Sequence, residues 1–165
     1  MPPEVHFDLS TIDPGKVLYD RAAIRRVNPQ RFEMEHLDGI LHIDLEQKLI
    51  VGFKDVRADE FWVRGHMPGM PLLPGVIMCE AAAQLGSFYA VMAGVYGRNG
   101  VLGLGGLEDV RFRGPVRPGD RLMLVAKPIR VKSRQSIFDV QGFVAGSMVF
   151  HAQVIGIRLE APPGD

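Results

Sequence analysis

Residues 74–96, PGVIMCEAAAQLGSFYAVMAGVY, decide the fold, because they predict one long helix at the centre of the molecule. Proline and glycine come just before the apolar run, so the helix is expected to begin at Val76. It should continue to about Tyr96, where Gly97 and then Asn99-Gly100 are residues that commonly end helices.

This predicted helix is apolar on nearly every face. From Val76 to Val95 its only clearly polar side chains are Glu80, Gln84 and Ser87. A helix that is hydrophobic all round is buried all round. Other elements of the chain must therefore wrap around it.

The remaining chain supplies strands for this wrapper. Alternation of side chains, as in Leu122–Lys127, is typical of strands with one buried face. The segments expected as strands are Gly39–Leu45, Leu49–Val56, Val101–Leu104, Glu108–Phe112, Asp120–Arg134, Gln135–Val144 and Ser147–Leu159. A hairpin, one buried helix and then several meandering strands predict an α+β fold with an antiparallel sheet.

The chain of 165 residues is long enough for one domain with a substantial core. We expect this domain to cover residues 23–160 and to begin with one or two helical turns at Ala22–Val27. Residues 1–22 are rich in turn signals and are expected to form an N-terminal extension. Residues 161–165 are expected to be a disordered tail.

Composition excludes several classes of function. The formal net charge is zero, so nothing draws the whole chain toward nucleic acid or an anionic membrane. No apolar run approaches the roughly 20 residues that span a bilayer, and the N-terminus lacks the pattern of a secretory signal. Cys79 is the only cysteine, which rules out an internal disulfide and fits a reducing compartment. We therefore expect a cytoplasmic protein.

A rigid loop precedes the helix and carries the first candidate catalytic residue, His66. The loop, residues 65–75, contains Pro68, Pro71 and Pro74. Proline fixes φ, so these residues should hold the backbone in one shape. An imidazole can take up a proton near neutral pH, which makes His66 a candidate base. A lone histidine beside a glycine is nevertheless more often a surface residue.

Glu80 is the second candidate, because it is an ionisable residue in an otherwise apolar helix. Gln84, at position i+4, shares its face and can hold its carboxyl group. The N–H of Gly75 opens the helix without an intrahelical acceptor and can bind an oxyanion. A base, an acid and an oxyanion donor predict proton abstraction beside a carbonyl group, with an enolate to stabilise. The competing interpretation of Glu80 is an exposed partner of the helix dipole.

No metal site is expected. The histidines show neither the i,i+4 pairing nor the carboxylate clustering of the usual zinc motifs. They are His6, His36, His42, His66 and His151.

Two blocks of sequence resemble the 3-hydroxyacyl-(acyl carrier protein) dehydratases of FabZ type. Residues 65–76, GHMPGMPLLPGV, with 80–84, EAAAQ, are similar to the hallmark G-H-F-P-G-x-P-x-M-P-G-V…E-A-x-A-Q of that family. Residues 110–122, VRFRGPVRPGDRL, are similar to its A-R-F-R-x-P-V-x-P-G-D-x-L. The likeness extends over roughly residues 24–159.

The resemblance implies a hotdog fold, in which a curved antiparallel sheet wraps around one long helix. It implies homodimers whose active sites combine the histidine of one subunit with the acid of the other, and three such dimers can form a hexamer. His66 would be the base at C2 of a 3-hydroxyacyl thioester, and Glu80 would help the C3 hydroxyl leave as water. The Gly75 N–H would bind the thioester oxygen, and the carbonyl of Leu72 would orient His66. No cofactor is implied.

The chain departs from this family in its first strand. Glu33 stands where the family has proline, and Glu35-His36 stand where it has two leucines. Ionisable groups are costly to bury, so this strand is expected to be more exposed, to be locally shifted, or to shape a different pocket mouth.

The resemblance also implies an acidic acyl carrier protein as partner. Basic residues outnumber acidic ones between residues 98 and 134, which fits such a carrier. They are Arg98, Arg111, Arg113, Arg117, Arg121, Lys127, Arg130, Lys132 and Arg134. Two alternatives stay open at this point: a hotdog acyl thioesterase, and a non-catalytic paralogue that binds acyl thioesters.

Overall fold

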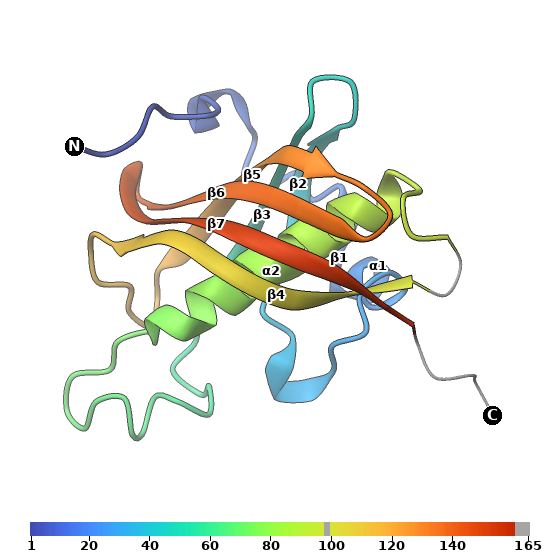
Figure 1. Cartoon of the computed structure of the whole chain (residues 1–165). Coiled ribbons are helices and arrows are strands. Elements are labelled where there is room, and N and C mark those ends of the chain that lie inside the picture. Colours follow the sequence, from blue (N-terminus) through green and yellow to red (C-terminus); the bar gives the residue numbers. More distant parts are fainter. Residues whose placement is uncertain (98–99, 161–165) are drawn as a thin grey trace.

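The computed structural model describes residues 1–97 and 100–160, in which one antiparallel sheet wraps around one long helix (Figure 1). The expected tail, residues 161–165, and the residues Arg98 and Asn99 lie outside the described residues. The seven strands lie in the order β1 (Tyr19–Asp20), β2 (Gly39–Asp44), β3 (Leu49–Asp55), β5 (Arg121–Val131), β6 (Gln135–Val144), β7 (Ser147–Glu160) and β4 (Gly100–Phe112). All neighbouring strands are antiparallel, which confirms the predicted α+β class.

The central helix α2 covers Gly75–Met92, and its predicted extension to Tyr96 was wrong. Ala93 caps the helix with its N–H on the carbonyl of Tyr89, and Gly94 follows with a φ of +73°. Glycine adopts this left-handed conformation without a steric cost, so the helix ends here.

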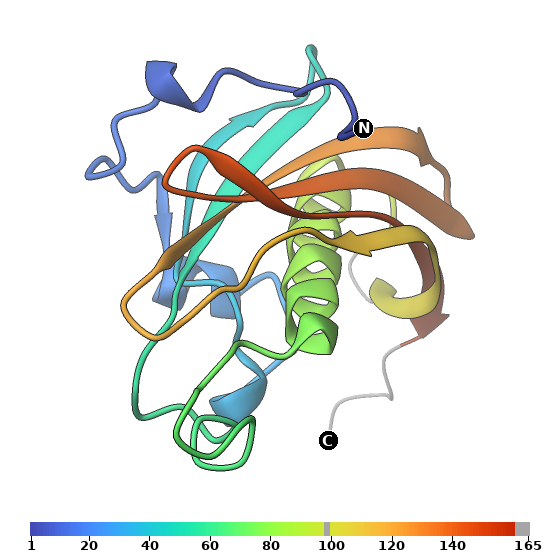
Figure 2. The same cartoon turned by 90° about the vertical axis from the view of Figure 1, so that its left-hand side faces the viewer.

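The sheet buries α2 as the apolar sequence predicted. The prediction that no apolar run approaches the length of a membrane span was wrong for α2, since by length and mean hydropathy (1.3) the helix would be able to cross a membrane. However, 67% of it is buried within the chain. Figure 2 shows the strands curving around its length. The apolar character of α2 is therefore that of a core helix.

Two details of the sheet differ from the prediction. Val101–Leu104 and Glu108–Phe112 belong to a single strand, β4, whose pairing with β7 shifts register at two places. The glycine-rich centre of β4 hid this continuity, because glycines interrupt the alternation of side chains. The short strand β1 was not predicted, since two residues carry no periodic pattern.

The N-terminal residues pack on the outer face of the sheet. The ring of Phe7 stacks on His42 with 5.5 Å between ring centroids, and Phe7, Leu9 and Ile12 pack against a small apolar cluster there. The backbone N–H of His6 donates to Oε1 of Gln141 over 3.0 Å. The segment then leads through β1 into the short helix α1, Arg21–Arg25, capped by Asp20.

The stretch before β2 is shifted out of the strand rather than simply exposed. Phe32–Met34 forms a 3₁₀ turn, η2, after which Glu35 forms an ion pair of 2.7 Å with Arg25. His36 is only 1% exposed, and neither of its ring nitrogens has a hydrogen-bond partner among the described residues. The expectation of greater exposure is therefore wrong for His36, because its imidazole takes the place of an apolar core side chain.

Candidate active site

His66 lies exposed on the loop before α2, and its ring is held by the same loop. Nδ1 lies 2.8 Å from the carbonyl oxygen of Leu72. Because a carbonyl oxygen only accepts, Nδ1 carries the proton and Nε2 keeps a free lone pair. The N–H of Leu72 donates back to the carbonyl of His66 over 2.9 Å. The expected contact between His66 and Leu72 is present, and it leaves Nε2 available as a base.

Glu80 is half-buried on α2, and the expected contact with Gln84 is present. Nε2 of Gln84 donates to Oε1 of Glu80 over 2.8 Å and to the carbonyl of Met34 over 2.6 Å. Oε1 of Gln84 accepts the backbone N–H of His36 over 3.0 Å. Gln84 is 2% exposed, so these bonds form in the interior, where they fix the side chain. Gln84 thereby orients one carboxylate oxygen of Glu80 and leaves the other free.

Glu80 lines a cavity of about 30 Å³ between α2 and the β4 edge. Its other polar lining residues are Gln30 and Ser87, and Leu102 and Leu104 are among the apolar ones. This volume suits one or two water-sized groups. His66 is not among the lining residues, so a single chain does not bring the two candidate residues into one cavity.

Gly75 is the first residue of α2, so its N–H has no intrahelical acceptor. A Cβ at this position would lie 2.6 Å from the ring of Phe112. That ring stacks on Phe150, with centroids 5.7 Å apart, and Phe112 is an exposed residue. Glycine at position 75 therefore lets an aromatic side chain of β4 lie directly against the helix N-terminus.

The β4 edge of the sheet exposes apolar side chains. β4 forms one end of the sheet order, so one of its edges carries no strand among the described residues. The exposed apolar residues on this strand and its neighbour β7 are Leu104, Leu107, Phe112, Ile157 and Leu159. A long apolar edge strand is a template for pairing with another chain.

Two of the basic residues predicted to attract a carrier already have partners within the chain. Arg121 forms an ion pair with Asp55, with 2.6 Å between Nε and Oδ1, and its guanidinium lies 4.0 Å from the ring centroid of Phe53. Nε of Arg113 donates to His151 over 3.2 Å. Arg98 lies outside the described residues.

Sequence reasoning missed Gln30 as a residue of the Glu80 cavity. Ser87 follows Glu80 by two helical turns, so helical spacing alone would have placed it there. Gln30 is fifty residues from Glu80 in sequence, and no local pattern indicates that they are neighbours. Across residues 1–97 and 100–160 there is no cluster of three or more His, Cys, Asp or Glu residues with the geometry of a metal site.

A curved antiparallel sheet around one apolar helix, with a carboxylate on that helix and a histidine on the loop before it, defines a hotdog-fold protein. Solved structures share this fold. They include the dehydratase heterocomplex ApeI:P from Xenorhabdus doucetiae, with a TM-score of 0.68, 14% identity, and coverage of 85% of this chain and 91% of that one. Another is Cj0977 from Campylobacter jejuni, with a TM-score of 0.64, 15% identity, and coverage of 92% and 99%.

Sequence comparison defines the family more closely. Residues 28–153 match the model of the FabA-like domain. The 3-hydroxyacyl-[acyl-carrier-protein] dehydratase FabZ of Desulfotalea psychrophila is 34% identical, over 87% of this chain and 95% of the relative. FabZ of Syntrophobacter fumaroxidans is 35% identical, over 82% and 91%. The bifunctional enzyme LpxC/FabZ of Chlorobaculum tepidum is 33% identical, and this chain spans 31% of its length. The chain therefore belongs to the FabA-like family, as a 3-hydroxyacyl-[acyl-carrier-protein] dehydratase of FabZ type.

Proposed function

We propose that this protein removes water from (3R)-3-hydroxyacyl thioesters on an acyl carrier protein and releases trans-2-enoyl thioesters, in fatty-acid or related lipid synthesis. The observation that carries the proposal is that two candidate catalytic side chains, His66 and Glu80, are each held in a fixed orientation in a chain of FabZ type. His66 has its Nδ1 committed to Leu72, and Glu80 is fixed by Gln84. These contacts orient a group that can accept a proton and a group that can donate one.

The reaction needs two proton transfers and an oxyanion site. Nε2 of His66 takes the proton from C2, and the electron pair moves toward the thioester oxygen, which the N–H of Gly75 stabilises. Glu80 gives a proton to the C3 hydroxyl, the C3–O bond breaks, and water leaves as the C2–C3 double bond forms. His66 then carries the proton from C2 and Glu80 lacks one, so release of the proton from His66 and uptake of a proton by Glu80 complete the cycle.

The site is proposed to form between two copies of the chain. Glu80 and His66 do not line the same cavity in one chain, and the β4 edge exposes apolar side chains beside the Glu80 cavity. Pairing of this edge with a second copy would bury these side chains and bring the partner's loop to Glu80. Sedimentation velocity will distinguish a dimer from a hexamer of three dimers.

The carrier is proposed to bind through its acidic surface to basic side chains on this protein. Charge complementarity of this kind mainly increases the rate of association and weakens with added salt. The cytoplasm is the proposed compartment, since the only cysteine, Cys79, is a buried free thiol.

The test uses purified protein with 3-hydroxybutyryl and longer 3-hydroxyacyl carrier thioesters. The conjugated enoyl thioester is followed by its ultraviolet absorbance and by mass. We expect loss of water that falls by about 100-fold or more in His66→Ala and in Glu80→Gln, while both variants stay folded. Release of free thiol without a requirement for the 3-hydroxyl group would instead identify a thioesterase. Tight binding of the acyl carrier without turnover would identify a non-catalytic paralogue.

A further inference from the structure

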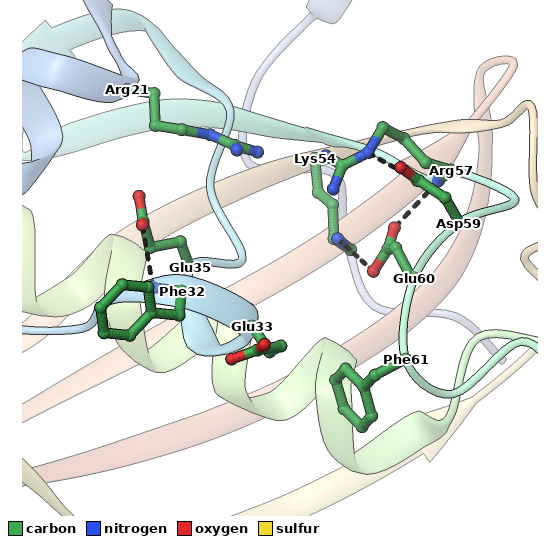
Figure 3. Close-up of a pocket in the computed structure, with 9 residues that line it drawn as sticks. All are labelled: Arg21, Phe32, Glu33, Glu35, Lys54, Arg57, Asp59, Glu60 and Phe61. Atoms are coloured by element: carbon green, nitrogen blue, oxygen red, sulfur yellow. Dashed lines mark hydrogen bonds and ion pairs between the residues drawn. The ribbon is translucent and has the colours of Figure 1, made fainter.

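The whole connection from β3 to α2, residues 56–74, carries His66 and is called the His66 loop here; it is anchored on a buried ion pair. Nζ of Lys54, on β3, lies 2.8 Å from Oε2 of Glu60, and the two side chains are 2% and 6% exposed. Figure 3 shows them facing each other in the wall of a pocket of about 290 Å³. Charged groups at this depth require complete hydrogen bonding to be tolerated.

The carboxylate of Glu60 has partners on both oxygens. Oε2 also accepts the indole N–H of Trp62 over 2.9 Å, and Oε1 accepts the backbone N–H of Arg57 over 2.9 Å. Burial alone would raise the pKa of Glu60, but the hydrogen bonds from Lys54, Arg57 and Trp62 outweigh it and lower the pKa below its ordinary value. Glu60 is therefore an anion that fixes the start of the loop.

The backbone of Trp62 connects this anchor to His66. The carbonyl oxygen of Trp62 accepts the N–H of His66 over 2.8 Å and that of Gly65 over 3.2 Å. Trp62 is 4% exposed, whereas His66 is exposed. At the other end of the loop, the N–H of Leu73 donates to the carbonyl of Val116 over 2.8 Å. An exposed imidazole thus lies between two buried attachment points.

We propose that Glu60 is a positioning residue for His66, acting through Trp62, in the dehydration proposed above. A buried ion pair contributes little net stability compared with an apolar pair of similar volume. What the pair adds is a fixed position for the backbone of the loop. Lys54 holds the carboxylate of Glu60, and this carboxylate holds the indole of Trp62. The carbonyl of Trp62 in turn holds the backbone N–H of His66. A displacement of about 1 Å is enough to lower the rate of a reaction between two oriented groups by up to about 100-fold.

The decisive variant replaces both charges at once, as Lys54→Met with Glu60→Leu. Removal of one partner alone would leave a buried unpaired charge and strongly destabilise the chain, whereas the double replacement leaves no unpaired charge. Because Trp62 and Arg57 lose the acceptor for their N–H groups, we expect a folded protein with a lowered melting temperature, an unchanged KM and a kcat lowered about tenfold. Trp62→Phe keeps an aromatic ring but removes the indole N–H together with part of the ring system, and it should lower kcat in the same direction. Asp59→Asn, a change in the exposed part of the same loop, is the matched control and should leave kcat unchanged.

A second readout does not depend on turnover. In the wild-type protein, nitrogen NMR of His66 should report the single tautomer with the proton on Nδ1, as its contact with Leu72 requires. In the double variant we expect a mixture of tautomers. A folded double variant with wild-type kcat and an unchanged His66 spectrum would overturn the positioning role. Absence of dehydration in the wild-type protein would instead contradict the proposed function, and the NMR comparison would still decide whether Glu60 positions His66.

Discussion

Gln84 and Glu80 lie one helical turn apart on α2, and the amide nitrogen of Gln84 donates a hydrogen bond of 2.8 Å to the carboxylate of Glu80. The amide nitrogen of Gln84 also donates to the carbonyl of Met34, and its amide oxygen accepts the backbone N–H of His36. Both residues lie before β2. One buried side chain therefore connects the proposed acid, the central helix and the shifted segment in which this chain departs from the FabZ pattern.

Gln84→Leu should lower both stability and activity. The substitution leaves the buried N–H of His36 and the carbonyl of Met34 without partners and frees Glu80 to change rotamer. We expect a loss of about 2 to 4 kcal/mol in the free energy of unfolding and a fall in kcat of about tenfold. Urea denaturation and steady-state kinetics measure these effects. Gln47→Leu, at an exposed turn, is the control and should change neither stability nor kcat. A Gln84→Leu protein as stable as wild type would contradict the proposed role of Gln84 in connecting Glu80 to the segment before β2.

His36 should make the folded state sensitive to mild acid. Burial and then the nearby charge of Lys54 lower its pKa from 6.5 to about 4. The unfolded chain takes up a proton on His36 near pH 6.5, whereas the folded chain does so only near pH 4. Above pH 6.5 the free energy of unfolding is therefore not reduced by protonation of His36. It decreases as the pH falls from about 6.5 to about 4, by about 3 kcal/mol in total.

The comparison protein for this pH effect is His36→Leu, which has the residue of the FabZ pattern. We expect it to show a smaller pH dependence of unfolding between pH 6.5 and 5, and the part that remains is expected from His151, whose pKa is also lowered by burial. Denaturant midpoints at several pH values measure this slope. Equal slopes in the two proteins would show that His36 is not the group responsible.

Gly75→Ala should impair catalysis through a clash rather than through loss of a hydrogen-bond donor. The new Cβ would meet the Phe112 ring at 2.6 Å and displace the start of α2 or the ring. We expect kcat/KM to fall about 10- to 100-fold, and Gly75→Ala with Phe112→Ala to recover part of the loss, because the N–H remains. Gly15→Ala, which meets only an ordinary contact at 3.4 Å, is the control. Wild-type kinetics in Gly75→Ala would show that the close approach of the Phe112 ring to Gly75 does not affect catalysis.

A charge on the β4 edge should separate the subunits. Leu107 is 38% exposed on this strand, and Leu107→Glu would place a carboxylate in the proposed interface. We expect sedimentation velocity to show monomers and the dehydration rate to fall with them. Ile129→Glu alters an apolar residue that is also exposed, but on β5, and should leave assembly intact. A Leu107→Glu protein that keeps the wild-type mass would exclude this edge as the interface.

The elements with strong local signals could be predicted from the sequence. The hairpin β2–β3 follows from two strand-like segments separated by the polar residues Glu46-Gln47-Lys48, and α2 follows from an apolar run opened by Pro74-Gly75. The contact between Gln84 and Glu80 follows from helical spacing alone. The end of α2 was misplaced because Gly94 and Gly97 both adopt the left-handed conformation, with φ of +73° and +66°, and the sequence does not tell at which of them the helix ends.

The features that join distant parts of the chain could not be predicted. Gln84 meets His36 across forty-eight residues, and the N-terminal residues reach Gln141 across the sheet. Burial of His36 depends on how the whole core packs, and the residues next to His36 in the sequence do not indicate it. In the proposed site His66 and Glu80 come from two chains, and no spacing within a single sequence specifies such an arrangement.

The most direct test of the account mixes two inactive variants, His66→Ala and Glu80→Gln, dissociates and reassociates them, and measures dehydration of a 3-hydroxyacyl carrier thioester. If each site takes His66 from one subunit and Glu80 from the other, a mixed dimer holds one intact site and one doubly altered site. Random reassociation should then restore about a quarter of wild-type activity. Activity that stays at the level of the separate variants, although mixed dimers are present, would contradict a site shared between two chains.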